Sequence, residues 1–258
     1  MLPLVVFVIA AGGFLWIFRD GWLTSRWKQP KEAMPPSAIS ILQEKVPYYS
    51  QLSESDKQHF EFKIQEFLLN CKISGVNTEV SEEDALLIAS SAIIPIFYFK
   101  EWRYENIDEV LLYPDSFNFK FETTGQHRDV LGMVGEGVMN GKMILSKRAL
   151  HQGFSNETDK KNTAIHEFVH LIDKSDGLTD GVPSVLLEKQ YVIPWLDMMN
   201  RKMDEIYGQK SDIDRYGGTS EIEFFAVASE YFFERPELLE KKHPQLYAML
   251  EEMFRPRK

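Results

Sequence analysis

Residues 162–173 decide the fold, and they read Asn-Thr-Ala-Ile-His-Glu-Phe-Val-His-Leu-Ile-Asp. His166 and His170 are four residues apart, so on an α-helix they share one face and can point at one metal ion. Glu167 lies about 100° round the helix from His166, beside the metal, where a carboxylate can act as general base for a metal-bound water. The remaining large side chains are apolar: Ile165, Phe168, Val169, Leu171 and Ile172. Because burying two histidines and a glutamate is costly unless something binds them, the stretch predicts a metal-binding helix in the core.

The composition is that of a folded protein and excludes several functions. The chain has 258 residues, of which 44% are hydrophobic and 26% charged, values typical of globular proteins. Its formal net charge of −10 argues against nucleic acid as a partner, since phosphate binding needs a basic face. Cys71 is the only cysteine, so neither an intrachain disulfide framework nor a thiolate metal cluster can form. A single cysteine also favours a reducing compartment.

The amino-terminal residues 2–18 carry no charged side chain. A run of about 17 apolar residues is near the lower limit for crossing a bilayer as a helix, and we expect residues 1–18 to form a transmembrane anchor. Two alternatives are a cleaved signal peptide, which would need a basic residue ahead of the run, and a buried core helix. Basic residues follow the run instead: Arg19, Arg26, Lys28 and Lys31. The positive-inside rule then predicts a single-pass protein of the inner membrane with its main domain in the cytoplasm.

The remainder of the chain divides into a linker and one domain. Residues 19–37 are rich in proline and charge and poor in apolar residues, so they are interpreted as a linker, with the folded domain at residues 38–258. Capping signals and apolar spacing predict helices over 54–70 and 82–94, and short strands are expected within 96–125 and at 141–146. The predicted class is α+β. If the strand at 141–146 edges the cleft, it could pair with an extended peptide, and an interior strand without a ligand is the alternative.

The third metal ligand does not follow His170 directly. Asp176 stands six residues after His170, where another histidine would complete one known pattern, and Asp173 replaces the glycine of the metzincin motif. A catalytic zinc site usually has three protein ligands and one open position, and a glutamate on a second helix is the other common source of the third ligand.

A second buried helix is predicted from Thr219 or Ser220 to about residue 233. Glu223 and Glu230 are seven residues apart and share one face of it, whereas Glu221 falls off that face. Spacing alone leaves Glu223 and Glu230 both open as the ligand. A metal-binding histidine usually donates its second ring N–H to a carboxylate or carbonyl, and Asp173 and Glu230 are the candidates for that role or for polar support nearby. A plain salt bridge is the alternative for Glu230.

These motifs resemble a known family. H-E-F-V-H-x-x-D, followed by Y-G-x-x-x-E-x-E-F-F-A-V-x-S-E-Y-F-F, resembles the Mlc titration factor A family of zinc peptidases and, more distantly, the catalytic domain of anthrax lethal factor. The resemblance covers roughly residues 40–250. Weaker upstream matches are Asp108-Glu-Val110, Tyr113-Pro114, Gly135-Glu136 and Ile144-Leu-Ser146.

The resemblance implies a zincin-like fold and a gluzincin site. In that site His166, His170 and Glu223 bind one Zn²⁺, Glu167 is the general base and Tyr216 assists the tetrahedral intermediate. It also implies an aminopeptidase-like activity and, for the members of enteric bacteria, binding of the Mlc repressor.

We therefore expect a membrane-tethered, zinc-dependent peptidase that acts on a peptide or protein substrate. The alternative is a membrane-tethered binding module that docks a transcription regulator or another protein, with catalysis secondary or lost. Activity that depends on Glu167, set against partner binding that does not, would separate the two.

Overall fold

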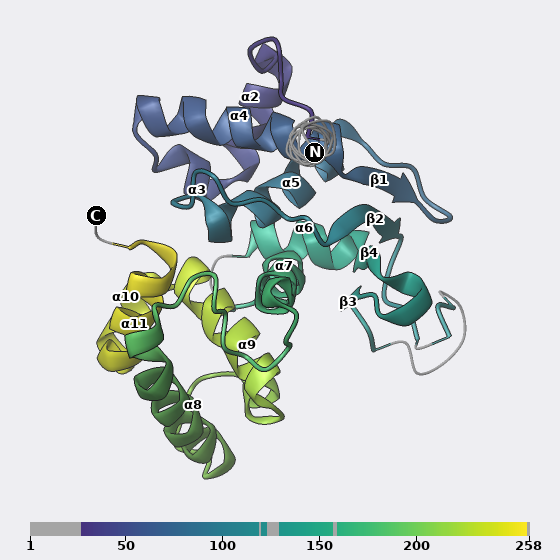
Figure 1. Cartoon of the computed structure of the whole chain (residues 1–258). Helices are drawn as coiled ribbons and strands as arrows, with labels where there is room; N and C mark the ends of the chain where they lie inside the picture. Colours follow the sequence, from purple (N-terminus) through teal and green to yellow (C-terminus); the bar gives the residue numbers. More distant parts are fainter. Residues whose placement is uncertain (1–26, 119, 123–128, 157–158, 257–258) are drawn as a thin grey trace, which may run out of the picture.

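The structure is a computed structural model that describes residues 27–118, 120–122, 129–156 and 159–256 (Figure 1). The predicted transmembrane anchor at residues 1–18, and the linker up to residue 26, lie outside these residues. Within the described ranges, no helix is long and apolar enough to cross a membrane. The anchor and its orientation therefore stay predictions.

A small mixed sheet forms one side of the domain (Figure 1). The strand order is β1-β2-β4-β3, in which β1, β2 and β4 run parallel and β3 runs antiparallel to β4. The strands are β1 (Lys72–Gly75), β2 (Ile107–Tyr113), β3 (Gly132–Val134) and β4 (Gly141–Ser146). With helices packed around this sheet, the predicted α+β class is confirmed.

Two expectations about the strands need correction. Of the short strands expected within 96–125, only β2 is a regular strand, and Phe117 adds an isolated bridge to Val130. The strand at 141–146 forms as predicted, but it lies between β2 and β3 and has both backbone edges paired. A peptide therefore cannot add to β4, and the open edge on this side of the described sheet belongs to β3.

The helices expected over 54–70 and 82–94 begin where the capping signals predict. Ser53 accepts a hydrogen bond from the amide of Asp56, and Ser81 forms a capping box with Asp84. Such caps satisfy amide groups that have no partner within the first helical turn. The two helices are α4 (Glu54–Asn70) and α5 (Glu82–Ile96). Two helices that were not predicted, α2 (Pro36–Lys45) and α3 (Pro47–Ser50), precede them and begin without a side-chain cap.

The chain contacts the domain before residue 38. The backbone of Lys28 exchanges two hydrogen bonds with the Asn70 side chain, at 2.8 and 2.7 Å. Met34 is buried, and α2 already begins at Pro36. The domain boundary stays a prediction, but ordered contacts begin at least ten residues ahead of it.

The second half of the domain is helical, and α7 lies at its centre (Figure 1). It packs against α5 and α6 on one side, β3 on another and α9 on a third. The α-helices are α6 (Lys147–Ser155), α7 (Thr163–Asp173), α8 (Val192–Tyr207), α9 (Glu221–Glu234), α10 (Pro236–Lys242) and α11 (Pro244–Phe254). The 3₁₀ turns are η1 (Gly137–Met139), η2 (Lys174–Asp176), η3 (Lys189–Tyr191) and η4 (Arg215–Gly218).

Aromatic packing fixes α7 against the amino-terminal half. The ring of Phe168 is fully buried, 5.7 Å from that of Phe67 on α4 and 5.3 Å from that of Tyr104. Phe168 points away from the histidine face of the same helix, so one side of α7 builds the core and the other carries polar groups.

Replacing Phe168 by alanine should lower the free energy of unfolding by about 3–5 kcal/mol, because a buried ring is lost and a cavity remains. Phe62→Ala is the control, since Phe62 is 38% exposed and its loss should cost under about 1 kcal/mol. Urea denaturation of both variants measures the difference. Equal costs would show that Phe168 does not anchor α7.

Candidate metal centre

Helix α7 holds both histidines in place. The Oδ1 atom of Asn162 caps the helix by accepting a hydrogen bond from the amide of Ile165 at 3.1 Å. One turn apart on the same face, the imidazoles of His166 and His170 bring their Nε2 atoms to 3.0 Å of each other. Their rings meet edge to face, with centroids 4.6 Å apart. The predicted pairing of the two histidines is therefore present in the structure.

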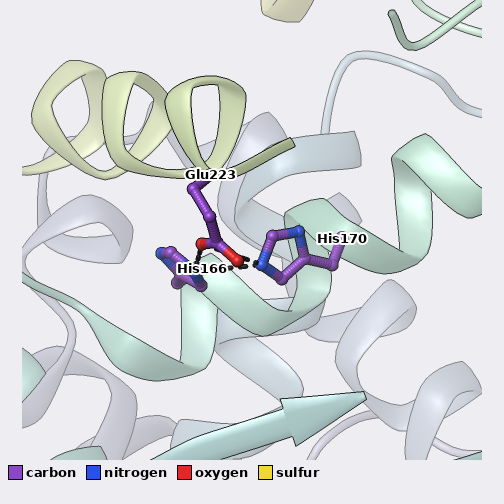
Figure 2. A group of neighbouring side chains, drawn as sticks. All are labelled: His166, His170 and Glu223. Carbon is purple, nitrogen blue, oxygen red and sulfur yellow. Dashed lines mark hydrogen bonds and ion pairs between the residues drawn. The ribbon is translucent and has the colours of Figure 1, made fainter. Parts of the chain in front are cut away.

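Helix α9 brings Glu223 to the two histidines. Ser220 caps this helix through the amide of Glu223, which fixes the glutamate in the first turn. Figure 2 shows the Glu223 carboxylate pointing from α9 toward the imidazoles. Its Oε2 atom lies 3.0 Å from Nε2 of His166 and 3.5 Å from Nε2 of His170. Of the two glutamates that spacing left open, Glu223 is the one that joins both histidines.

These three atoms fit a metal ion. Their mutual distances of 3.0–3.5 Å match the edge of a coordination tetrahedron, which is about 3.3 Å for metal–ligand bonds near 2.0–2.1 Å. Two imidazole nitrogens facing each other at 3.0 Å with a carboxylate oxygen beside them form a donor set typical of zinc. Among the described residues, His166, His170 and Glu223 are the group that could hold a metal.

Glu230 orients His166. Its Oε1 atom lies 2.7 Å from Nδ1 of His166, and its Oε2 atom accepts the backbone N–H of Asn162 at 2.7 Å. A carboxylate at Nδ1 holds the ring proton on that nitrogen, which leaves the lone pair of Nε2 free for a metal. The second candidate role for Glu230, orienting a ligand histidine, is the one that the structure supports.

The pKa values of the two central carboxyl groups shift in opposite directions. Burial raises the pKa of Glu167, which is 6% exposed, although the charges of His166 and His170 partly offset this shift. Burial also disfavours the charged form of Glu223, but hydrogen bonds from His166 and His170 outweigh it and lower the Glu223 pKa. Glu167 is thus suited to accept a proton, and Glu223 is suited to act as a permanently charged ligand.

Strand β3 lies directly against Glu167. A Cβ atom added at Gly132 would come within 2.6 Å of the Glu167 side chain, so a larger residue there would displace the carboxylate. The strand with the open edge is therefore also the strand beside the predicted base.

Tyr216 lies beside His166 on the short turn η4. Its ring stacks on that of His166, with centroids 6.0 Å apart and an angle of 28° between the planes. The side chain is 53% exposed, and partial burial together with the charge of Glu223 raises its pKa to about 12. Tyr216 is therefore a hydrogen-bond donor at any physiological pH.

Asp173 does not contact a histidine ring, which corrects one of the two expectations for this residue. Its Oδ2 atom accepts the amide N–H of Gly181 at 3.0 Å, while Oδ1 is buried without a hydrogen-bond partner among the described residues. The carbonyl of Gly181 in turn accepts a hydrogen bond from Trp195 at 2.8 Å. Asp173 thus ties the loop after α7 to the core.

Asn162 and Gly132 have roles at the site that were not predicted from the sequence. Asn162 both caps α7 and donates to Glu230, and the signal for this was available, because asparagine directly before an apolar helix is a capping residue. Nothing in the sequence placed Gly132 beside Glu167, since that contact depends on how the sheet meets α7.

Two histidines on one helix, a glutamate on a second and a buried carboxyl group beside them define the class of the centre as metallopeptidase-like. The chain belongs to the glucose-regulated metallo-peptidase M90 family, whose sequence model matches residues 20–255. An uncharacterized protein of Synechocystis sp. is 31% identical over 98% of this chain and 97% of its own length.

Two further relatives are called Mlc titration factor A. The protein of Pectobacterium atrosepticum is 26% identical over 81% of this chain and 83% of its own length. The protein of Serratia proteamaculans is 24% identical over 85% of this chain and 89% of its own length. These matches confirm the resemblance to the Mlc titration factor A family, while the distant similarity to anthrax lethal factor stays a prediction.

Asp173 should make stability fall as pH rises. Burial raises its pKa to about 6, so the folded state holds a proton that the unfolded chain releases above its ordinary pKa of 3.8. The stabilisation is complete below about pH 4 and is lost as pH rises through about 6, a change on the order of 3 kcal/mol. Asp173→Asn should therefore gain stability relative to wild type between pH 4.5 and 7, measured by urea denaturation of metal-free protein.

Asp176→Asn is the control for this titration. Asp176 is exposed, and hydrogen bonds from Ser184 and Leu178 lower its pKa although partial burial alone would raise it. Asp176→Asn should therefore lose stability relative to wild type as pH rises, the opposite of Asp173→Asn. A stability difference between Asp173→Asn and wild type that does not vary with pH would contradict the assignment.

Proposed function

We propose that the protein is a zinc-dependent peptidase. The observation that carries this proposal is the convergence of His166, His170 and Glu223 beside the buried carboxyl group of Glu167. Membership of a metallopeptidase family supports it independently.

In this proposal His166, His170 and Glu223 hold one Zn²⁺, and Glu230 keeps the His166 ring in the required tautomer. Bound zinc would supply a Lewis acid that polarises the scissile carbonyl group and lowers the pKa of a coordinated water to about 7. The contacts to Glu230 matter because a misoriented imidazole weakens metal binding by about 10–100-fold in comparable sites.

Glu167 moves the proton, and Tyr216 stabilises charge. A buried carboxyl group with a raised pKa is suited to accept a proton from water and then deliver it to the leaving amine. Tyr216 keeps its phenolic proton and would donate it as a hydrogen bond to the developing oxyanion. One such donor is worth about 3 kcal/mol of transition-state stabilisation in other enzymes.

The open edge of β3 favours an extended peptide as the substrate. An extended peptide that pairs with the open edge of this strand would run past Glu167, because Gly132 touches the Glu167 side chain. The resemblance further favours an aminopeptidase-like activity. Aminoacyl-coumarin substrates and internally quenched peptides, tested side by side, would distinguish cleavage at the amino terminus from internal cleavage.

Glu167→Gln should abolish peptide cleavage and leave about one zinc per chain, because the base is lost while the ligand set is intact. Peptide hydrolysis and elemental analysis of the purified full-length protein measure both effects. Glu221→Gln is the matched control, since Glu221 lies on the same helix as Glu223 and is exposed. Wild-type turnover in Glu167→Gln would exclude Glu167 as the base.

A second candidate function is the docking of a regulatory protein. It is favoured by the relatives that are called Mlc titration factor A. In that case partner binding would persist in Glu167→Gln, and the site would serve structure more than chemistry. Retained binding together with lost cleavage in this variant would show that the two functions are separable.

We also propose that residues 1–18 tether the domain to the inner membrane, with the domain in the cytoplasm. The support is the uncharged run at residues 2–18 and the basic residues that follow it.

The full chain should sediment with membranes, resist extraction by high salt and dissolve in detergent, whereas residues 27–258 should stay in the supernatant. A carboxyl-terminal green fluorescent protein should fluoresce, and a carboxyl-terminal alkaline phosphatase should be inactive. Full-length protein that is released by salt alone would contradict a spanning anchor.

A further inference from the structure

Tyr216 needs support, because it lies on a four-residue turn and 53% of its side chain is exposed. On the carboxyl-terminal side, two glycines press the turn against neighbouring helices. A Cβ atom at Gly217 would lie 3.1 Å from Val227 of α9, and one at Gly218 would lie 2.9 Å from Ile206 of α8. Glycine packing thus fixes one side of the turn.

On the amino-terminal side, the Lys160 side chain binds the loop that leads into the turn. Its Nζ atom donates to the backbone carbonyl of Asp212 at 2.8 Å and to the Oδ2 atom of the same residue at 2.6 Å. The Lys160 ammonium group also lies 4.5 Å from the centre of the Tyr231 ring on α9. Lys160 has a φ of 66°, a left-handed conformation that is unfavourable for a lysine and indicates that its contacts hold it there.

Asp212 is the centre of this arrangement. Besides Lys160, its carboxylate accepts hydrogen bonds from the Tyr231 hydroxyl at 2.9 Å and from Lys242 at 3.0 Å, and its Oδ1 atom lies 2.8 Å from Nε2 of His243. Although burial works against ionisation, these partners lower the pKa of Asp212. The loop before Tyr216 is thereby fastened to α9, to α10 and to the segment before α7.

The next residues of the same segment continue the link. Lys161 lies 2.8 Å from Oδ2 of Asp214, whose Oδ1 atom accepts the amide N–H of Tyr216 at 3.0 Å. Asn162 follows and donates its amide N–H to Glu230, which holds His166. Three consecutive residues therefore connect the start of the histidine helix to the tyrosine turn and to the carboxylate behind His166.

We propose that Lys160 and Asp212 are positioning residues, which hold the Tyr216 turn in register with His166. This inference rests on the proposed function for its catalytic consequence, because only a catalytic Tyr216 would make its position matter for turnover. The effect of the Lys160–Asp212 contact on the position of Tyr216 does not depend on that function and can be measured separately.

The first measurement concerns the position of Tyr216. Full-length protein labelled with 3-fluorotyrosine gives a ¹⁹F resonance for Tyr216, identified by its loss in Tyr216→Phe. In Lys160→Met this resonance should move toward the value of an exposed tyrosine and sharpen, whereas Lys160→Arg should restore much of the original signal. An unmoved resonance in Lys160→Met would overturn the proposal.

Lys142→Met is the matched control. Lys142 is also partly exposed and pairs with a carboxylate, Glu109, but it lies on the sheet. It should leave the Tyr216 resonance unchanged. The same shift in this variant would attribute the effect to a general loss of stability and contradict the proposal.

The second measurement is kinetic. Lys160→Met should lower kcat about 10-fold or more with KM and zinc content little changed, since small misplacements of catalytic groups are costly. In a Tyr216→Phe background, which should itself lose roughly 100-fold, Lys160→Met should add little. A full additional loss in that background would show that Lys160 acts by another route.

These experiments distinguish a failure of the positioning proposal from a failure of the proposed catalytic role of Tyr216. If the resonance moves and Tyr216→Phe retains wild-type turnover, the positioning contact stands and the catalytic role of Tyr216 is wrong. If Tyr216→Phe is impaired and Lys160→Met is not, Tyr216 is catalytic and the positioning role is wrong.

Discussion

The carboxylate of Glu230 is the contact on which the site depends. It bonds His166 with one oxygen and the amide of Asn162 with the other, so it joins a histidine of the candidate metal centre and the start of α7 to α9. Because Glu223 lies two turns earlier on the same helix, the position of Glu230 also sets how far Glu223 reaches toward the histidines. A single buried hydrogen-bonded carboxylate thereby fixes the registry of both helices.

The charges around this contact call for a cation. Glu167, Glu223 and Glu230 surround two imidazoles in a partly buried space, and an uncompensated group of this kind would be costly. Burial alone would lower the pKa of His166, but the carboxylates of Glu230, Glu223 and Glu167 outweigh it and raise that pKa. The surroundings of the imidazole therefore favour a positive charge. A divalent ion satisfies that demand without protonating the imidazoles, and so it leaves their lone pairs available as ligands.

The sequence predicted those parts of the fold that depend on local signals. Helices α4, α5 and α9 begin at the expected capping residues because a cap and an apolar repeat lie within one short stretch. The choice between Glu223 and Glu230 could not be made this way, since residues seven apart share a face and differ by about 10 Å along the axis. The family resemblance implied Glu223, and the placement of α9 against α7 shows why: it brings Glu223 to both histidines. The strand order was not predictable for the same reason: β3 has three residues, and its pairing with β4 leaves no periodic pattern.

The segment before α7 shows why the finer features of the site stay hidden in a sequence. Lys160 and Asp212 are 52 residues apart, and each alone is an ordinary charged loop residue. Their importance comes from what they adjoin: Asn162 is two positions after Lys160, and Tyr216 is four positions after Asp212. An ion pair between two loops thus sets the distance between the histidine helix and an exposed tyrosine. The two helices position the candidate metal ligands but not Tyr216, which lies on a turn outside them. In this proposal the loops that contain Lys160 and Asp212 fix the position of Tyr216.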